Sequence, residues 1–295
     1  MKGPLHRFVS ASAGCRSPPA STGWRGVADQ LIAKPYSNPP SSEGGQFNGG
    51  QGLRVRIYSD LHREFEAWEA PESSNVDLVI LAGDVDKKGR GVKWANEAFD
   101  CPVAYISGNH EFYDGHVDRT LQKMRDAASG HVHILENETM VLGNLRVLGT
   151  TGWTDFTVTG DQVAASNLAR EWMGDFKYIR VDSNYRRLRP DDVIARNHVA
   201  KAWLRQELVK KFEGSTIVVT HHCPSPVMIG GQHEGHLTAA YANDWQHLFP
   251  DVDVWVFGHT HEVVDIDLAG CRVISNPKGY PNEKTGFNPY FEIQV

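Results

Sequence analysis

Five predominantly apolar runs, each followed by a short polar segment, constrain the fold of this 295-residue chain most strongly. They cover residues 53–58, 76–82, 103–106, 217–220 and 252–257. Short runs rich in β-branched residues and bounded by Gly or polar residues indicate buried β-strands. In the first run Arg54 and Arg56 alternate with apolar residues, which indicates a strand partly facing solvent or a helix layer.

Segments with helical spacing separate these runs, at residues 91–99, 114–128, 161–173 and 191–212. Further short strands are predicted at 132–135, 139–142 and 145–150, and closing strands at 262–267, 271–275 and 290–295. Strands that alternate with helices predict an α/β fold in which helices cover the sheets.

The polar segments contain residues that bind metals. They are Asp60-Leu61-His62, Gly83-Asp84, Gly108-Asn109-His110-Glu111, His221-His222 and Gly258-His259-Thr260-His261. Each follows the carboxyl end of a predicted strand, where open α/β sheets bind their ligands. Glycine at three of these turns lets the backbone bend sharply and approach a ligand closely.

Carboxylate and imidazole groups suit borderline divalent ions such as Mn²⁺, Fe²⁺ and Zn²⁺. Asp-x-His and His-x-His place two donors on one side of an extended segment, because side chains alternate with period two. One Asp can bridge two cations, since a carboxylate has two oxygens. The sequence has no paired-thiolate motif, so a structural zinc site is not indicated.

In this order, the five segments resemble the motifs of the calcineurin-like metallophosphoesterase superfamily, from about residue 53 to the C-terminus. The resemblance implies a sandwich of two mixed β-sheets flanked by helices. It also implies a dinuclear centre. The first metal would be held by Asp60, His62 and His261, the second by Asn109, His221 and His259, with Asp84 bridging both.

The same resemblance places His110 beside the leaving group without binding metal. Glu111 stands where many relatives have Asp, and that position would orient His110. Two metals about 3.5–4 Å apart would activate a water that attacks phosphorus in line. Catalysis is therefore assigned to Asp84 and His110. His222 is either a partner that orients His221 or a structural residue. Lys278 is interpreted as a solvated turn residue rather than a phosphate ligand.

The substrate class is less constrained than the metal site. The Asn-His pair and the short chain resemble small bacterial phosphodiesterases, which favours a small or nucleotide-like phosphodiester. The alternatives are a phosphomonoesterase, a pyrophosphate hydrolase, or a scaffold of this fold that has lost catalysis. The complete ligand set argues against the scaffold. The oligomeric state is not indicated.

Composition sets broader limits. The net charge of −6 argues against stable nucleic-acid binding. No apolar run approaches the roughly 20 residues needed to span a bilayer. The four cysteines form no C-x-x-C pair, which indicates reduced thiols and a cytoplasmic location.

Two domain features are also predicted. Residues 1–50 are rich in Ser, Pro and Gly and are interpreted as a disordered or targeting extension, or as an upstream start, before a catalytic domain at 51–295. Residues 153–189 combine aromatic residues with five Arg. They form either a cap over the pocket or a helix with core aromatics and a solvated Arg face.

Overall fold

The computed structural model describes residues 34–35, 52–231 and 235–295. The predicted extension at residues 1–50 therefore lies almost entirely outside the described residues. Its described part is strand β1 (Lys34–Pro35), which pairs antiparallel with β12.

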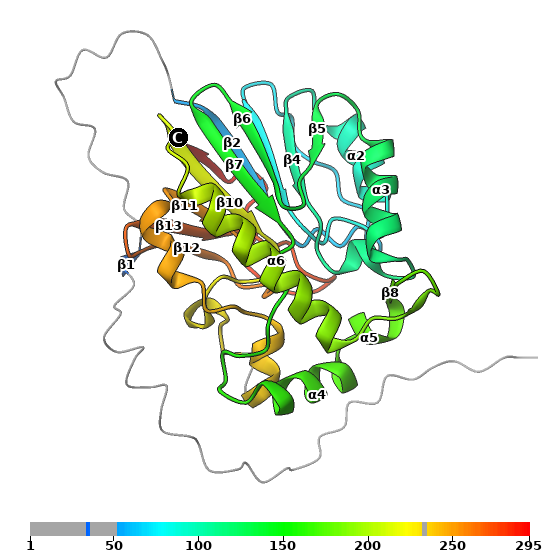
Figure 1. Cartoon of the computed structure of the whole chain (residues 1–295). Coiled ribbons are helices and arrows are strands. Elements are labelled where there is room, and N and C mark those ends of the chain that lie inside the picture. The colour runs from blue at the N-terminus through cyan, green and yellow to red at the C-terminus, as the bar shows by residue number, and fades with distance from the viewer. Residues whose placement is uncertain (1–33, 36–51, 232–234) are drawn as a thin grey trace, which may run out of the picture. The chain divides into compact units, whose positions relative to one another are not determined.

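One sheet has five strands, built around the first three apolar runs (Figure 1). Its order is β14 (Glu292–Gln294), β2 (Arg54–Tyr58), β3 (Leu78–Ala82), β4 (Val103–Ile106) and β5 (Val132–Ile134). Strands β2 to β5 are parallel, and β14 pairs antiparallel with β2.

The other sheet has seven strands and is also mixed. Its order is β1, β12 (Val264–Leu268), β13 (Cys271–Ser275), β11 (Val254–Val256), β10 (Ser215–Thr220), β7 (Leu145–Thr150) and β6 (Glu138–Leu142). The central strands β13, β11, β10 and β7 are parallel, whereas the pairs at either edge are antiparallel.

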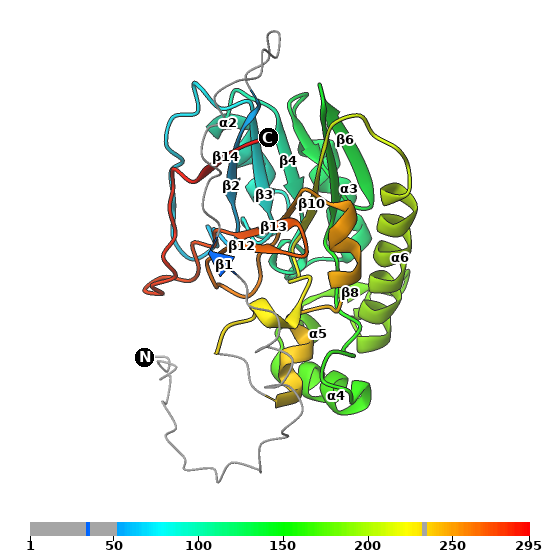
Figure 2. The same ribbon diagram turned by 90° about the vertical axis from the view of Figure 1, so that its left-hand side faces the viewer.

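The two sheets pack face to face and are flanked by helices (Figures 1 and 2). Apolar residues such as Ile57, Ile80, Val147 and Val219 form the core between the sheets. Helix α6 (Pro190–Leu208) covers the seven-stranded sheet. Helices α2 (Arg90–Ala98) and α3 (Val117–Ala127) cover the five-stranded sheet. The predicted α/β sandwich of two mixed sheets is confirmed.

Shorter elements gather beyond the carboxyl ends of the strands. They are α4 (Gln162–Trp172), α5 (Asp175–Tyr178), the hairpin β8 (Arg180–Val181)–β9 (Arg186–Arg187), and the 3-10 turns η1 (His110–Phe112), η2 (Pro226–Met228) and η3 (Gly235–Ala240). Phe112, Trp153, Phe156 and Phe176 share an apolar cluster here. These elements form a layer over this end of the sandwich, whereas the 3-10 turn η4 (Gln246–Asp251) packs with α6 on the seven-stranded sheet.

The first strand agrees with its prediction except at Arg56. Arg54 is exposed, but Arg56 is only 5% exposed and does not face solvent. Its guanidinium instead donates to Glu292 on the neighbouring strand β14 and to the carbonyl oxygens of Pro71 and Glu72. The long predicted helix also ends earlier than expected, at Leu208. None of the helices in the described part of the chain has the length and apolar character needed to cross a bilayer.

Candidate metal centre

The polar segments that follow five strands converge at one end of the sandwich, from both sheets. Tyr58, Ala82 and Ile106 end strands of one sheet, and Thr220 and Val256 end strands of the other. Five residues in these turns have positive φ: Asp60, His62, Asp84, His259 and His261. Non-glycine residues rarely adopt this conformation, and it clusters at functional sites where the surroundings impose it.

Asp60, His62 and His261 form the first group that could hold a metal ion. The Nε2 atoms of His62 and His261 lie 3.1 Å apart, and His261 Nε2 lies 3.6 Å from Asp60 Oδ1. Ligand atoms on one zinc-like ion are separated by roughly 3.0–3.4 Å, given bonds of about 2.1 Å. The spacing of these atoms therefore fits a shared cation.

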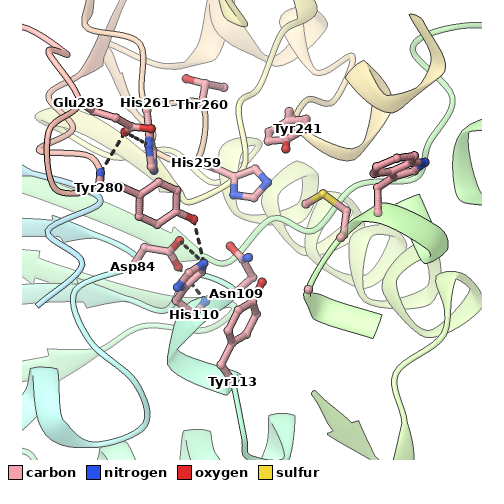
Figure 3. Close-up of a pocket in the computed structure, with 13 residues that line it drawn as sticks. Asp84, Asn109, His110, Tyr113, Tyr241, His259, Thr260, His261, Tyr280 and Glu283 are labelled. Atoms are coloured by element: carbon pink, nitrogen blue, oxygen red, sulfur yellow. Dashed lines mark hydrogen bonds and ion pairs between the residues drawn. The ribbon is translucent and has the colours of Figure 1, made fainter. Parts of the chain in front are cut away.

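Asp84, His221 and His259 form a second such group, entirely buried. His221 Nε2 lies 3.4 Å from Asp84 Oδ1 and 3.0 Å from Asn109 Oδ1. The other oxygen of Asp84 lies 3.8 Å from His62 Nε2, in the first group. Asp84 is thus placed between the two groups, as a bridging carboxylate would be. Figure 3 shows Asp84, Asn109, His259 and His261 facing the same space.

Two atoms in these groups are buried and lack a hydrogen-bond partner within the described structure: Asp60 Oδ2 and His259 Nε2. A buried acceptor without a partner costs free energy, so native proteins rarely leave one. Metal coordination would satisfy both. The donor set of carboxylate, amide oxygen and imidazole also suits divalent ions. The residues present therefore fit the metal centre that the sequence predicts.

Hydrogen bonds around the groups orient the ligand atoms. His221 Nδ1 donates to the carbonyl oxygen of Ala82, which leaves its Nε2 lone pair directed at Asp84 and Asn109. The Asn109 amide donates to Asp175, which turns its carbonyl oxygen toward His221. An outer acceptor of this kind fixes the tautomer of a metal-binding histidine.

The glycines at the turns are required by close packing. A Cβ added at Gly108 would collide with the carboxylate of Asp84, and one at Gly83 would collide with the ring of His221. Gly83 also has φ of +89°, in the left-handed region that glycine tolerates. The absence of a side chain at both positions allows neighbouring motif loops to pack in direct contact.

His110 stands beside these groups and is held by a residue that sequence analysis missed. Glu64 Oε1 accepts a hydrogen bond of 2.7 Å from His110 Nδ1 and lies 3.2 Å from His62 Nδ1. The Tyr280 hydroxyl lies 3.3 Å from His110 Nε2, on the pocket side (Figure 3). Glu64 follows the Asp-x-His motif by two residues, and that proximity was the only sequence signal for it.

Charges in this cluster shift the pKa values strongly. Burial opposes a charged His110, but Asp84 and Glu64 outweigh it and raise the pKa of His110 to about 9. Burial alone would raise the pKa of Glu64, yet hydrogen bonds from His110 and His62 lower it to about 2. His110 and Glu64 therefore form a charged pair near neutral pH, with a proton on His110.

Glu111 does not orient His110. Its carboxylate accepts hydrogen bonds from the backbone N–H groups of Asp84, Val85 and Gly108, and from the Tyr105 hydroxyl. Burial and the nearby Asp84 raise its pKa to about 7. Glu111 instead links its own loop to the loop that carries Asp84 through these hydrogen bonds.

Two residues with open interpretations are also placed. His222 Nδ1 donates to the carbonyl oxygen of Thr151. The imidazole ring of His222 packs against that of His259, with the two ring centroids 4.3 Å apart. Burial and His221 lower the pKa of His222 to about 3, so it stays neutral. Lys278 forms an ion pair with Glu66 at 3.1 Å.

A cavity of about 260 Å³ opens from these groups, and its outer wall is aromatic. Asp84, Asn109, His110, His259 and His261 form its base, and Tyr113, Trp172, Tyr241 and Tyr280 line its sides. None of the described residues that line it is Lys or Arg.

Residues 153–189 combine features of the two predicted alternatives, a cap over the pocket and a segment with core aromatics. Trp153, Phe156 and Phe176 are buried core residues, but Trp172 is 67% exposed and lines the cavity. Met173 and Gly174 line it as well. Core aromatics and pocket-wall residues therefore occur in the same segment.

Buried His/Asp clusters beneath an open cavity are typical of metal-dependent hydrolases. The family model described as calcineurin-like phosphoesterase matches residues 53–263. The chain belongs to this family of metal-dependent phosphoesterases, as its motifs predicted.

Similar proteins span nearly the whole described domain. An uncharacterized protein, L509, of Acanthamoeba polyphaga mimivirus is 22% identical over 280 residues, covering 82% of this chain and 96% of the relative. The crystal structure of a phosphopantetheinyl hydrolase from Mycobacterium tuberculosis superimposes with a TM-score of 0.64 at 18% identity, covering 84% and 97% of the two chains. The protein TT1561 of Thermus thermophilus gives a TM-score of 0.45 at 14% identity, covering 78% and 90%. At 18% identity the match to the hydrolase describes the fold alone.

Proposed function

We propose that this protein hydrolyses a small phosphodiester at a dinuclear centre. Asp60, His62 and His261 would hold one divalent ion and Asn109, His221 and His259 the other, with Asp84 bridging. When bound, two ions such as Mn²⁺, Fe²⁺ or Zn²⁺ supply an activated water and neutralise charge on the phosphate oxygens. The convergence of these ligand atoms supports the assignment.

The residues that line the cavity support a diester as the preferred substrate. A phosphomonoester is a dianion, and sites that bind one commonly add Arg or Lys to grip the extra charge. The described lining residues of this cavity include neither, and four of its residues are Tyr or Trp. A diester carries a single negative charge and a second organic group, which an aromatic wall can contact.

His110 is the group that would act on the leaving oxygen. Its Nδ1 is occupied by Glu64, so its Nε2 faces the cavity and lies 3.9 Å from Asp84 Oδ2. A protonated Nε2 can donate to the departing alkoxide, an effect of typically 10²–10⁴-fold. Glu64 and Tyr280 would hold the ring in that orientation.

The test is a hydrolysis screen of chelated protein, before and after Mn²⁺ is restored. The panel contains bis(p-nitrophenyl) phosphate, p-nitrophenyl phosphate and pyrophosphate. It also includes a phosphopantetheinyl ester, because the similar Mycobacterium tuberculosis hydrolase is named for that group. We expect metal-dependent turnover with the highest kcat/KM on a diester.

Each alternative has its own outcome in this screen. A higher kcat/KM on p-nitrophenyl phosphate would show that the preferred substrate is a monoester. A higher kcat/KM on pyrophosphate would show that it is an anhydride. Metal binding without turnover on any member would favour the non-catalytic scaffold. The cytoplasmic location and the absence of stable nucleic-acid binding remain predictions.

A further inference from the structure

A second hollow, of about 320 Å³, lies outside the metal centre and is basic. Its lining consists of Arg170, Phe176, Lys177, Arg186, Arg187, Leu188 and Arg189. These residues come from the end of α4, from α5 and from the strand and turn that lead into α6 (Figure 1). Five of the seven side chains are cationic and none is acidic, in a chain whose net charge is −6.

One of the five cations is held in place by carboxylates. Arg186 forms ion pairs with Asp182 at 2.5 Å and Asp192 at 2.7 Å. Among the described residues, no carboxylate pairs with the side chains of Arg170, Arg187 or Arg189, which are all exposed. The hollow therefore keeps excess positive charge after Asp182 and Asp192 are counted.

Beneath these cations the floor is apolar. Phe176 and Leu188 are 6% and 2% exposed and belong to the apolar cluster of this layer. Like charges gathered over a low-dielectric surface repel one another, and an anion between them would relieve that repulsion. Arg is also the side chain whose planar donors best match phosphate oxygens.

The hollow shares a wall with the catalytic cavity. Arg170 and Lys177 line the hollow, whereas Trp172, Met173 and Gly174, between them in sequence, line the cavity. Residues two apart on a helix point to roughly opposite sides, which accounts for the division at the end of α4. Gly174 packs closely against the cavity residue Tyr113, since a Cβ added there would come within 2.6 Å of the Tyr113 hydroxyl.

We propose that this hollow binds the phosphate group of a phosphorylated small molecule, at a site separate from the metal centre. Its volume is in the range of small-molecule sites. A nucleic acid would require an extended basic stripe, whereas these cations are confined to one small hollow. The binding itself does not depend on the proposed diesterase activity.

Calorimetric titration of metal-loaded protein with inorganic phosphate tests the proposal. The variant is Arg187→Gln/Arg189→Gln. The matched control is Arg205→Gln/Lys211→Gln, which removes the same charge from exposed positions in and just after α6. We expect two binding events per chain in the parent and the control, at the metals and at the hollow. The variant should lose the event at the hollow, or bind there at least tenfold more weakly.

Equal phosphate binding by parent, control and variant would overturn the proposal. If the metal centre itself is misassigned, the parent shows one event and the variant none, so the two failures are distinguishable. Thermal melting of all three proteins verifies that the substitutions leave the fold intact.

The phosphate could belong to the substrate or to a separate ligand, and kinetics distinguish these sources. For a substrate phosphate, the variant raises KM at least tenfold for a diester that carries a terminal phosphate, but changes KM for bis(p-nitrophenyl) phosphate less than twofold. For a separate ligand, both KM values stay unchanged although the calorimetric event is lost.

Discussion

Replacing Glu64 by Gln tests the arrangement of the leaving-group residue most sharply. The Glu64 side chain is 2% exposed, and one of its oxygens accepts the 2.7 Å hydrogen bond from His110 Nδ1. Gln keeps the shape and an acceptor oxygen but removes the charge that favours a protonated His110. A hydrogen bond to a charged group contributes about 1.5–3 kcal/mol. Converted to rate, this is about 10- to 150-fold in kcat.

The loss should depend on the leaving group. A general acid matters most for an alkoxide of high pKa and little for p-nitrophenolate. The assay is therefore kcat across a series of diesters with leaving groups of rising pKa, with bound metal measured in each sample. His110→Ala should show the same trend with a larger loss, because it removes the acid itself.

Glu66→Gln is the matched control, since Glu66 lies in the same loop and contacts Lys278 rather than His110. We expect kcat within twofold of the parent. A loss in Glu64→Gln that is equal for good and poor leaving groups, with both metals bound, would refute the role of Glu64. Loss of one bound metal would instead show that Glu64 supports metal binding by orienting the ligand His62.

Two further predictions concern the pocket wall and stability. Trp172→Ala should raise KM for aromatic diesters at least fivefold and leave KM for dimethyl phosphate within twofold. The reason is that Trp172 is an exposed residue of the cavity wall. Equal effects on both substrates would contradict a contact between Trp172 and the organic group of the substrate. Glu292→Gln should lower the free energy of unfolding at pH 7 by about 2 kcal/mol, because Arg56 loses its charged partner. Although burial opposes it, Arg56 and Arg54 hold the pKa of Glu292 below its ordinary 4.5, so the difference from the parent should shrink as the pH falls below 4.5. A difference independent of pH in chemical denaturation would contradict this linkage.

The sequence predicted those parts of the protein that local patterns specify. Buried strands such as Leu78–Ala82 are short apolar runs, and strand ends place the motif residues at one edge whatever the details of packing. The motif order then led to the family, which the family model confirmed. The α/β sandwich was predictable for the same reason.

Residues whose roles depend on distant partners were not predictable from local patterns. Arg56 is buried because Glu292, 236 positions away, pairs with it from strand β14. Glu64 and Tyr280 belong to none of the five motif segments, and only the folded chain brings both to His110. Glu111 was assigned to its sequence neighbour, whereas the fold turns its carboxylate toward the loop of Asp84. The basic hollow likewise forms only when α4, α5 and the β9 turn meet.

Metal stoichiometry measured together with turnover tests the central claim most directly. Chelated protein is titrated with Mn²⁺ while hydrolysis of bis(p-nitrophenyl) phosphate is followed. We predict no turnover without metal and a rise that saturates at two ions per chain. In Asp84→Asn, which loses the bridging charge, we predict about one bound ion and almost no turnover. Full turnover in the chelated parent, or two bound ions with unchanged turnover in Asp84→Asn, would contradict the dinuclear mechanism.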